Sequence, residues 1–415
     1  MLNPVRLYLL LFSLYWAQGL PVGFMTHALP VILRAEGVSL THIGGFGLLM
    51  LPWSIKIFWA PLVDRFGDSK IGHYRSWILP TQILSVVILV ILSFFPIDSL
   101  SQTHYLFLFF ILLLCLNLTG ATQDIATDGL AVNLLKTDQQ HWGNTFQVVG
   151  SRLGFIVGGG VLLWALDGLS WQLTFLGLAL IVLINTIPVW FYKNEHIRTN
   201  TALQHAQLRF SLKDYFDHFT QSRELRCWLI VLISFKIADG LSGPLLKPLM
   251  VDMGLNFTQI GVYITMLGAF AALCGAAIAG YLLRHYARPI LLILFSYLKI
   301  LSLLAYAVLA FLFEQKIKIS NLVIYLINAV EDAISAMLLV VMLTLVMQYS
   351  RKVLAGTDFT FQVAIMATVG GGLYTVSGIL GDWLGYAMYL SSIVGIALFC
   401  LIPLYQWKRC YLKTS

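Results

Sequence analysis

The chain has 415 residues, of which 59% are hydrophobic and only 11% charged, and its mean hydropathy is +0.83. Soluble domains carry roughly a quarter of their residues as charged side chains, so this composition excludes an ordinary soluble protein and indicates a bilayer as the solvent. The net charge of +7 does not indicate nucleic-acid binding, because no solvated stretch clusters Lys and Arg on a domain. The five cysteines lack CxxC and Cys/His ligand spacing, so we expect no disulfide framework, metal site or cofactor.

Apolar runs that are long enough to cross the hydrocarbon layer recur along the whole chain. A spanning helix needs about 20 mostly apolar residues, and counting such runs predicts twelve spans. They lie near residues 7–33, 41–62, 76–96, 105–133, 143–166, 171–192, 227–251, 257–283, 288–312, 319–348, 356–380 and 386–407. The first run has no small-residue cleavage site, so we interpret it as a span and not as a removed signal peptide.

One long polar stretch, residues 193–226, separates the sixth and seventh predicted spans. We therefore predict an all-α membrane protein with an N-terminal six-helix bundle over residues 1–192, a cytoplasmic linker loop over 193–226 and a C-terminal six-helix bundle over 227–415. If both termini are cytoplasmic, most Lys and Arg fall on that side, and the opposite side receives at most Arg34, Lys247, Lys316 and Lys318. This asymmetry predicts that both termini face the cytoplasm.

The two predicted halves resemble each other. Thr145-Phe146-Gln147-Val148 recurs as Thr360-Phe361-Gln362-Val363, and Gln123-Asp124 matches Glu331-Asp332 at nearly the same separation and in the same order. Two parallel six-helix repeats related by a pseudo-two-fold axis are the layout of the major facilitator superfamily, in which a solute binds near the bilayer midplane and the halves rock. A polytopic protein with a chance echo is the alternative.

Ionisable side chains inside a span are costly, so each is a functional hypothesis. Asp124 and Asp128 share one face of the fourth span, where their repulsion favours protonation of one carboxyl and suits a proton-coupling site; the alternative places Asp128 at the cytoplasmic interface. Arg152 is the expected counter-ion, unless it snorkels to the surface. We expect Asp124→Asn to keep the fold and to abolish concentrative uptake.

The second half carries further ionisable groups. Lys236 and Asp239 have i, i+3 spacing, so either they neutralise each other or Lys236 binds an anionic solute. Glu331 and Asp332 are neighbours and cannot both face one cavity; we assign Glu331 to proton coupling, with Asp124 and Asp128. The expected substrate cavity contains Gln18, Lys56, Arg152, Lys236, Asp239 and Asp332.

A polar turn follows the second span, and glycines gather in the fifth and eleventh. The turn contains Asp64, Arg65, Gly72 and Arg75. Similar Gly/Asp/Arg turns link helices two and three throughout the superfamily and latch the cytoplasmic gate, so we assign these four residues to a gate; positive-inside anchoring is the alternative. The triplets Gly158-Gly159-Gly160 and Gly370-Gly371-Gly372 permit close helix packing.

Ordered motifs of the first half resemble the muropeptide-permease-like (AmpG-like) branch of the superfamily. They are Gln18-Gly19-Leu20-Pro21, Leu51-Pro52-Trp53, the stretch from Trp59 to Arg65, the stretch from Ala121 to Asp128, and Arg152-Leu153-Gly154. The branch includes peptidoglycan-recycling permeases, acetyl-coenzyme A transporters and inner-membrane siderophore permeases of the rhizobactin and pyochelin type. The stretches from Ala28 to Arg34 and from Thr127 to Val132 look most like the siderophore permeases.

The resemblance implies secondary active import of a siderophore, ferric or free, from periplasm to cytoplasm across the bacterial inner membrane by proton-coupled alternating access. An anhydro-muropeptide permease for peptidoglycan recycling is the alternative. The implied partners are a small-molecule substrate, protons and the bilayer, without nucleic acid, and the implied state is a monomer. The sequence contains no HExxH, GxSxG or Walker-type loop, so we expect neither an enzyme nor an ATP-driven pump.

Overall fold

The computed structural model describes residues 4–29, 32–33, 36, 46–68, 70–100, 102–192, 217–255 and 259–414. Within these ranges the regular structure is entirely helical, as predicted. The chain forms two compact units, residues 1–209 with 347–360 and residues 210–346 with 361–415.

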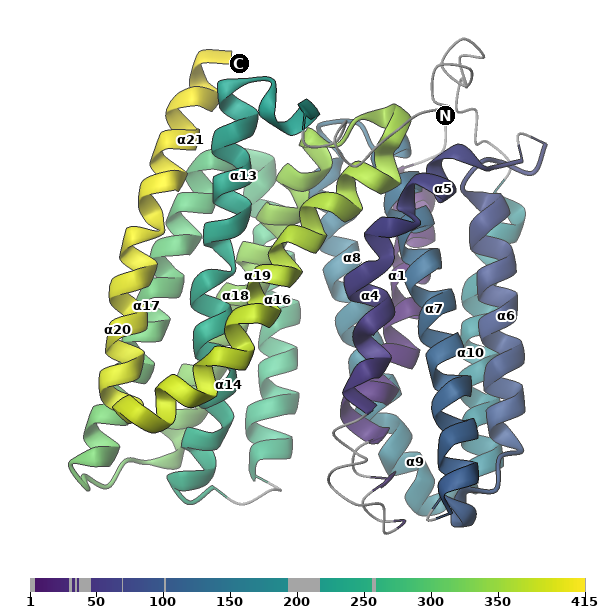
Figure 1. Cartoon of the computed structure of the whole chain (residues 1–415), viewed down its shortest axis with the longest axis horizontal. Helices are drawn as coiled ribbons and strands as arrows, with labels where there is room; N and C mark the ends of the chain where they lie inside the picture. Colours follow the sequence, from purple (N-terminus) through teal and green to yellow (C-terminus); the bar gives the residue numbers. More distant parts are fainter. Residues whose placement is uncertain are drawn as a thin grey trace. The chain divides into compact units, whose positions relative to one another are not determined.

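In the first unit the predicted second span is broken into short pieces. Pro52 and Pro61 lie in the first turns of two of these pieces, where a missing N–H group costs least, and each proline marks a new start. Within this unit α1 packs on α8, and α6 packs on both α7 and α10 (Figure 1). Its helices are α1 (Pro4–Gly23), η1 (Phe24–Ala28), η2 (Phe46–Met50), α4 (Leu51–Ile55), η3 (Lys56–Phe58), α5 (Ala60–Arg65), α6 (Arg75–Ser93), η4 (Ile97–Ser99), α7 (Thr103–Leu134), α8 (Gln140–Phe155), η5 (Ile156–Val161), α9 (Leu162–Gly168), α10 (Trp171–Phe191) and η8 (Lys352–Leu354).

In the second unit most predicted spans are long continuous helices, but the seventh is interrupted. It ends as one helix at Phe235 and resumes at Ile237, which leaves Lys236 at the break. Here α17 packs on α20, and α13 packs on α21. The helices are α13 (Arg223–Phe235), α14 (Ile237–Asp252), η7 (Ile260–Met266), α16 (Leu267–His285), α17 (Arg288–Glu314), α18 (Asn321–Tyr349), α19 (Ala355–Leu384), α20 (Tyr386–Phe399) and α21 (Leu401–Thr414).

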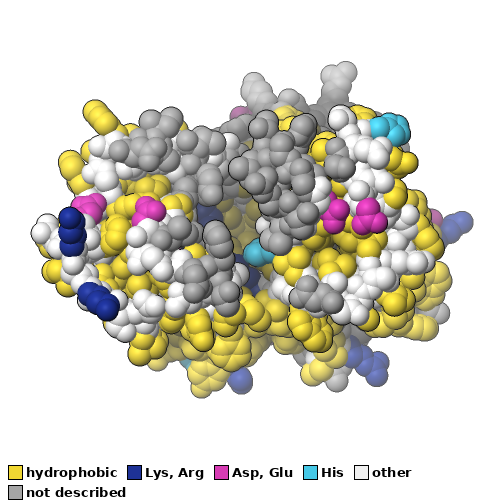
Figure 2. All heavy atoms as spheres, turned by 90° about the horizontal axis from the view of Figure 1, so that it is seen from below, with side chains coloured by type: hydrophobic (Ala, Val, Ile, Leu, Met, Phe, Trp, Pro, Cys, Tyr) yellow, Lys and Arg dark blue, Asp and Glu magenta, His cyan; other side chains and the backbone are white. Residues whose placement is uncertain are grey.

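The length and composition of the helices fit a multi-pass membrane protein. Within the described part of the chain, 11 helical segments are long and apolar enough to cross a membrane, and the shorter apolar helix Leu48–Phe58 lies where the second span is predicted. Large apolar side chains such as Trp164 and Trp383 are 76% and 83% exposed, which lipid rather than water accommodates. In Figure 2 hydrophobic side chains cover much of the visible flanks, and charged ones are sparse.

The units divide the chain differently from the predicted domains, and residues 217–226 of the predicted linker belong to the second unit. Residues 347–360, which were assigned to the C-terminal bundle, belong to the first unit. Asp64 on α5 accepts hydrogen bonds from the backbone N–H groups of Gly356 (3.1 Å) and Thr357 (2.7 Å) in this segment, at the start of α19. Most of the predicted linker, residues 193–216, lies outside the described residues.

Glycines bring α1 into backbone contact with the fifth span. A Cβ atom built on Gly154 would lie 2.5 Å from the Gly19 Cα, and one on Gly158 would lie 2.0 Å from the Leu20 carbonyl oxygen. No heavy atom of the described residues lies within 4 Å of a Cβ built on Gly160. A Cβ on Gly159 would lie 2.8 Å from the His27 Cβ. In the triplet of residues 158–160, close packing therefore requires glycine at positions 158 and 159 but not at position 160.

We expect Gly158→Ala to destabilise the first unit, because the new methyl group would have to push two backbones apart. Overpacking of this kind costs about 1–3 kcal/mol. The thermal midpoint of the purified protein in detergent should fall clearly for Gly158→Ala and stay near the wild-type value for Gly160→Ala. Equal midpoints for the two variants would show that α1 and η5 are not in backbone contact.

Candidate functional site

Buried ionisable side chains gather in two clusters, one in each unit. We define the N-terminal cluster as Tyr15, Gln18, Lys56, Asp124, Asp128 and Gln147, and the C-terminal cluster as Lys236, Asp239, Lys299, Glu331 and Ser335. Charge inside a membrane protein needs compensation, so the partners within each cluster decide what it can do.

An ion pair between Lys56 and Asp124 forms the centre of the N-terminal cluster. Lys56 lies at the start of η3, Asp124 lies on α7, and their side chains are only 4% and 12% exposed. The Lys56 ammonium also lies 5.3 Å from the centroid of the Trp53 ring. A buried, hydrogen-bonded pair of this kind is much harder to break than a surface pair, because either partner left alone would be an uncompensated buried charge.

Asp128 lies one helical turn after Asp124 and has no cation of its own among the described residues. Its Oδ1 accepts a hydrogen bond from the Tyr15 hydroxyl (2.8 Å) on α1 and one from the Gln147 amide (3.3 Å) on α8. Only 2% of Asp128 is exposed. Three elements, α1, α7 and α8, thus converge on one carboxyl group through neutral donors.

Gln18 links α1 to the same helix. Its side-chain amide lies 3.1 Å from the Thr127 hydroxyl and, with the nitrogen directed toward Asp124, 3.1 Å from the Asp124 Oδ1. The cluster therefore holds two carboxyls and one ammonium, so it is charge-balanced only when one carboxyl carries a proton. Such a site can take up and release one proton.

The counter-ion of Asp124 is not the predicted residue. Arg152, which was expected to neutralise the carboxylates of the fourth span, forms no ion pair with any described residue, whereas Lys56 does. Arg152 is partly exposed near the end of α8, so its charge does not need a buried partner. Lys56 in turn, assigned to the substrate cavity from the sequence, is occupied by Asp124.

The C-terminal cluster is built around Asp239. Its Oδ2 lies 2.9 Å from the Lys236 ammonium, which confirms the ion pair predicted from their spacing, and its Oδ1 lies 2.9 Å from the ammonium of Lys299 on α17. Lys299 also pairs with Glu331 on α18 and donates to Ser335 (2.7 Å). Two ammonium groups and two carboxylates are balanced without any added proton.

Lys299 was missed by the sequence reasoning, although a signal was available. It is the single charged residue in the middle of α17, a 27-residue helix that is otherwise apolar over most of its length. An unaccompanied lysine there predicts a buried partner. The identity of that partner depends on how α14, α17 and α18 pack, which the sequence does not contain.

Asp332 faces a different helix from Glu331, as expected for neighbours in a helix. Its Oδ2 accepts a hydrogen bond from Asn328 (2.9 Å), and it lies against Gly268 of α16, where a Cβ would meet it at 2.0 Å. These contacts place Asp332 in the packing between α16 and α18.

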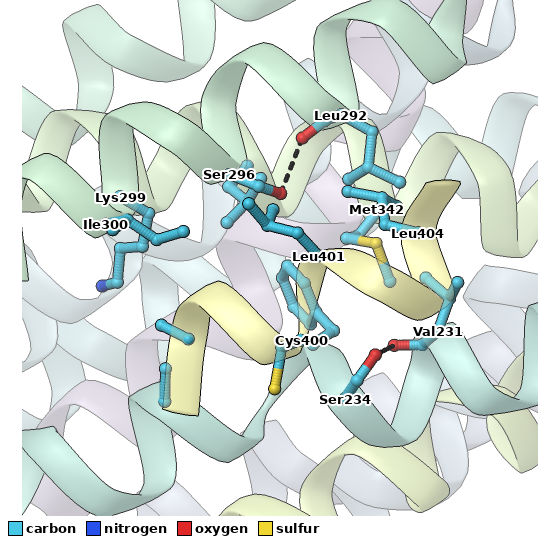
Figure 3. Close-up of a pocket in the computed structure, with 14 residues that line it drawn as sticks. Val231, Ser234, Leu292, Ser296, Lys299, Ile300, Met342, Cys400, Leu401 and Leu404 are labelled. Carbon is cyan, nitrogen blue, oxygen red and sulfur yellow. Dashed lines mark hydrogen bonds between the residues drawn. The ribbon is translucent and has the colours of Figure 1, made fainter. Parts of the chain in front are cut away.

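A cavity of about 50 Å³ lies beside the C-terminal cluster but offers no free polar donor. Its polar lining residues include Ser234 and Ser296, whose hydroxyls donate to Val231 and Leu292 of their own helices. Lys299 contributes its aliphatic stem to the wall, and its ammonium points away from the other lining side chains (Figure 3). The cavity suits an apolar group rather than an anion.

Of the four predicted gate residues, Asp64 contacts the start of α19. It accepts hydrogen bonds from the Tyr74 hydroxyl (2.6 Å) and from the buried backbone N–H groups of Gly356 and Thr357, so it caps the N-terminus of α19. Arg75 instead donates to backbone carbonyls, including that of Ile71 (3.3 Å). Arg65 is exposed and stacks on Phe66, and Gly72 supplies a turn with φ of 113°.

The pKa of Asp64 gives this contact a pH dependence. Burial raises that pKa from 3.8 to about 6, although hydrogen bonds from Thr357, Tyr74 and Gly356 oppose the rise. The folded protein therefore binds this proton more tightly than the unfolded chain, and the free energy of unfolding should fall by about 3 kcal/mol as pH rises from about 4 to about 6. Asp64→Asn should lack this loss in thermal melts across that range, whereas Asp68→Asn, at an exposed turn, should follow the wild type.

The sequence is similar to those of known membrane transport proteins. The sequence profile of the family described as Acetyl-coenzyme A transporter 1 matches residues 6–168. The chain is 27% identical over 279 residues to a protein named as transporter AmpG 4 in Rickettsia conorii, covering 65% of this chain and 66% of that protein. It is 27% identical over 299 residues to the anhydromuropeptide permease of Escherichia coli K12, covering 70% of this chain and 58% of that one. Both matches span less than two thirds of the relative.

Solved structures extend the likeness to the whole chain. A bacterial homologue of the iron transporter ferroportin has a TM-score of 0.69 at 17% identity, covering 98% of this chain and 100% of that one. The human organic anion transporter MFSD10 gives 0.70 at 13% identity with coverages of 98% and 100%, and the major facilitator superfamily transporter FucP gives 0.67 at 15% with 97% and 97%. The chain therefore has the fold of major facilitator superfamily transporters, and the two relatives described above carry the names of a transporter and a permease.

Proposed function

We propose that this protein imports anhydromuropeptides into the cytoplasm by proton-coupled alternating access. The observation that carries the substrate is the similarity to the anhydromuropeptide permease of Escherichia coli over 70% of this chain. The observation that carries the coupling is the unbalanced N-terminal cluster, with Asp124, Asp128 and a single ammonium from Lys56.

The substrate proposed here differs from the one that the motif resemblance implied. A siderophore was expected, but the bacterial relatives described above carry the names AmpG 4 and anhydromuropeptide permease, and neither name refers to a siderophore. The likeness to a ferroportin homologue is at 17% identity and concerns the fold alone. The muropeptide is therefore the better supported solute, and a siderophore is the alternative solute in the uptake experiment described below.

The two clusters have complementary parts in this proposal. Asp128, held by Tyr15 and Gln147, carries the transported proton, because it is the carboxyl that Lys56 does not neutralise. Glu331 is already matched by Lys299, which makes it a weaker candidate for coupling than the sequence indicated. Lys236, with a side chain that is 30% exposed, is the cation best placed to meet a carboxylate of the solute.

The proposed setting is a bacterial inner membrane, with both termini in the cytoplasm and the monomer as the working unit. The asymmetry of Lys and Arg between the loops supports the orientation. Asp64, joined to the start of α19, then lies on the cytoplasmic side, where its contact would hold a gate closed.

Uptake measurements test the proposal directly. A strain lacking its own permeases, expressing this chain, is given a labelled anhydromuropeptide or a labelled ferric siderophore, each with and without a protonophore. We expect muropeptide accumulation that the protonophore abolishes. Siderophore accumulation alone would make the proposed solute wrong, and muropeptide accumulation that persists with the protonophore would refute proton coupling.

A further inference from the structure

The two lysines of the C-terminal cluster differ in how their hydrogen-bond donors are used. An ammonium group has three donors. Lys299 directs its donors to Asp239 (2.9 Å), to Glu331 and to Ser335 (2.7 Å), so it is saturated. Lys236 has one polar partner among the described residues, Asp239 at 2.9 Å, so two of its donors are open to another acceptor.

Burial separates the same two residues. The Lys299 side chain is 9% exposed and lies within a continuous helix, whereas that of Lys236 is 30% exposed. Lys236 also occupies the break between α13 and α14, so the backbone around it is not fixed by an uninterrupted helix.

The side chain of Lys236 has room to move. Its Cβ faces Gly370 on α19, where a Cβ would lie 3.8 Å away, and Cβ atoms built on Gly371 and Gly372 would have no neighbour within 4 Å among the described residues. Its ammonium lies 5.2 Å from the centroid of the Phe235 ring, a contact that stabilises a cation. Because Gly370 has no side chain, α19 presents little at this contact that would hold the Lys236 side chain in one place.

The carboxylate that Lys236 would leave behind remains compensated. Asp239 uses separate oxygen atoms for its two lysines, Oδ2 for Lys236 and Oδ1 for Lys299. When Lys236 moves away, Asp239 keeps its ion pair with Lys299, which it then shares with Glu331, so it is not left as an isolated buried charge. A single lysine partner would not allow this exchange.

We propose that Lys236 is an exchangeable cation that leaves Asp239 to bind a carboxylate group of the transported solute, while Lys299 holds Asp239 in place. This assignment rests on the proposed import of an anionic muropeptide and names the group of that solute which the C-terminal unit recognises. Lys299 acts as a positioning residue, since it touches Asp239 and not the solute.

Binding measurements on the purified full-length protein in detergent test the exchange. The probes are an anhydromuropeptide and the same molecule with its peptide carboxylates amidated, followed by tryptophan fluorescence. A charge-assisted hydrogen bond should favour the acid by about tenfold or more in the wild type. Lys236→Met should bind the acid and the amide equally, and Lys236→Arg should restore the preference. An unchanged preference in Lys236→Met would overturn the proposal.

A second measurement needs no solute and separates this proposal from the proposed function. A water-soluble amine-acylating ester is applied, and modification is followed by peptide mass spectrometry relative to the exposed Lys316. Lys236 should react and Lys299 should not.

The variant Lys299→Met/Glu331→Gln removes one positive and one negative charge from the cluster, so Asp239 depends on Lys236 alone. Acylation of Lys236 should slow several-fold in this variant, and adding Asp239→Asn should restore the wild-type acylation rate. If the wild type binds neither probe, the muropeptide assignment fails, while an unchanged acylation rate would refute the exchange itself.

Discussion

Asp128→Asn should fold like the wild type and lose concentrative uptake. The asparagine oxygen can still accept the hydrogen bonds of Tyr15 and Gln147, and the ion pair between Lys56 and Asp124 is left intact. What disappears is the carboxyl without a cation, and with it the proposed transported proton. A pH gradient of one unit supplies about 1.4 kcal/mol per proton, which sustains roughly tenfold accumulation, so the variant should equilibrate the solute at a ratio of about one.

The measurement is accumulation in membrane vesicles with an imposed pH gradient, together with exchange of labelled for unlabelled solute at equal pH. Asp128→Asn should retain exchange, which shows that the protein folds and binds its solute. Asp138→Asn, at a polar turn between α7 and α8, is a suitable control and should accumulate normally. Wild-type accumulation by Asp128→Asn would assign the proton to another group.

Substituting either Lys56 or Asp124 alone should destabilise the protein far more than substituting both residues together. Lys56→Met leaves two carboxyls without a cation, and Asp124→Asn leaves the buried Lys56 ammonium without the carboxylate bonded to it, because Asp128 is held by Tyr15 and Gln147, so each single change should lower the free energy of unfolding by about 3–5 kcal/mol. The double variant Lys56→Met/Asp124→Asn leaves neither charge and should recover most of that loss. This expectation differs from the prediction drawn from the sequence, that Asp124→Asn keeps the fold, and the unfolding measurement decides between the two.

Thermal unfolding in detergent, with yield from size-exclusion chromatography, completes this double-mutant cycle. The coupling between the two substitutions should be large and favourable. Additive effects in the double variant would mean that the two side chains are not paired in solution. Lys352→Met is the matched control, because it removes an exposed lysine from the short helix η8, outside the buried clusters.

The features predictable from the sequence are those set by local composition. Long apolar runs gave helices at the predicted places, for example Trp171–Phe191 and Arg288–Glu314, because backbone groups in a bilayer must satisfy one another within the helix. The pair of Lys236 and Asp239 followed from i, i+3 spacing and is confirmed at 2.9 Å. Both inferences need only the geometry of a single helix.

The contacts that were missed join residues far apart in sequence. Lys56 meets Asp124 across 68 positions, and Tyr15 meets Asp128 across 113, so neither pairing has a local signature. The internal repeat was also of limited help. Gln147 donates to Asp128, whereas its counterpart Gln362 accepts from Trp228 (2.7 Å) and donates to the Val346 carbonyl. The same motif thus serves a carboxyl in one unit and helix packing in the other.

The two ammonium groups and two carboxylates of the C-terminal cluster carry no net charge together. This neutrality determines whether the membrane potential can drive transport. A solute with one negative charge, bound at Lys236 and carried with one proton on Asp128, adds no net charge to the protein. Its passage would generate no current. We expect uptake of such a solute to persist when a potassium ionophore removes the membrane potential, and to stop when a potassium–proton exchanger removes the pH gradient; a response to voltage alone would require a second proton or a cation in each cycle.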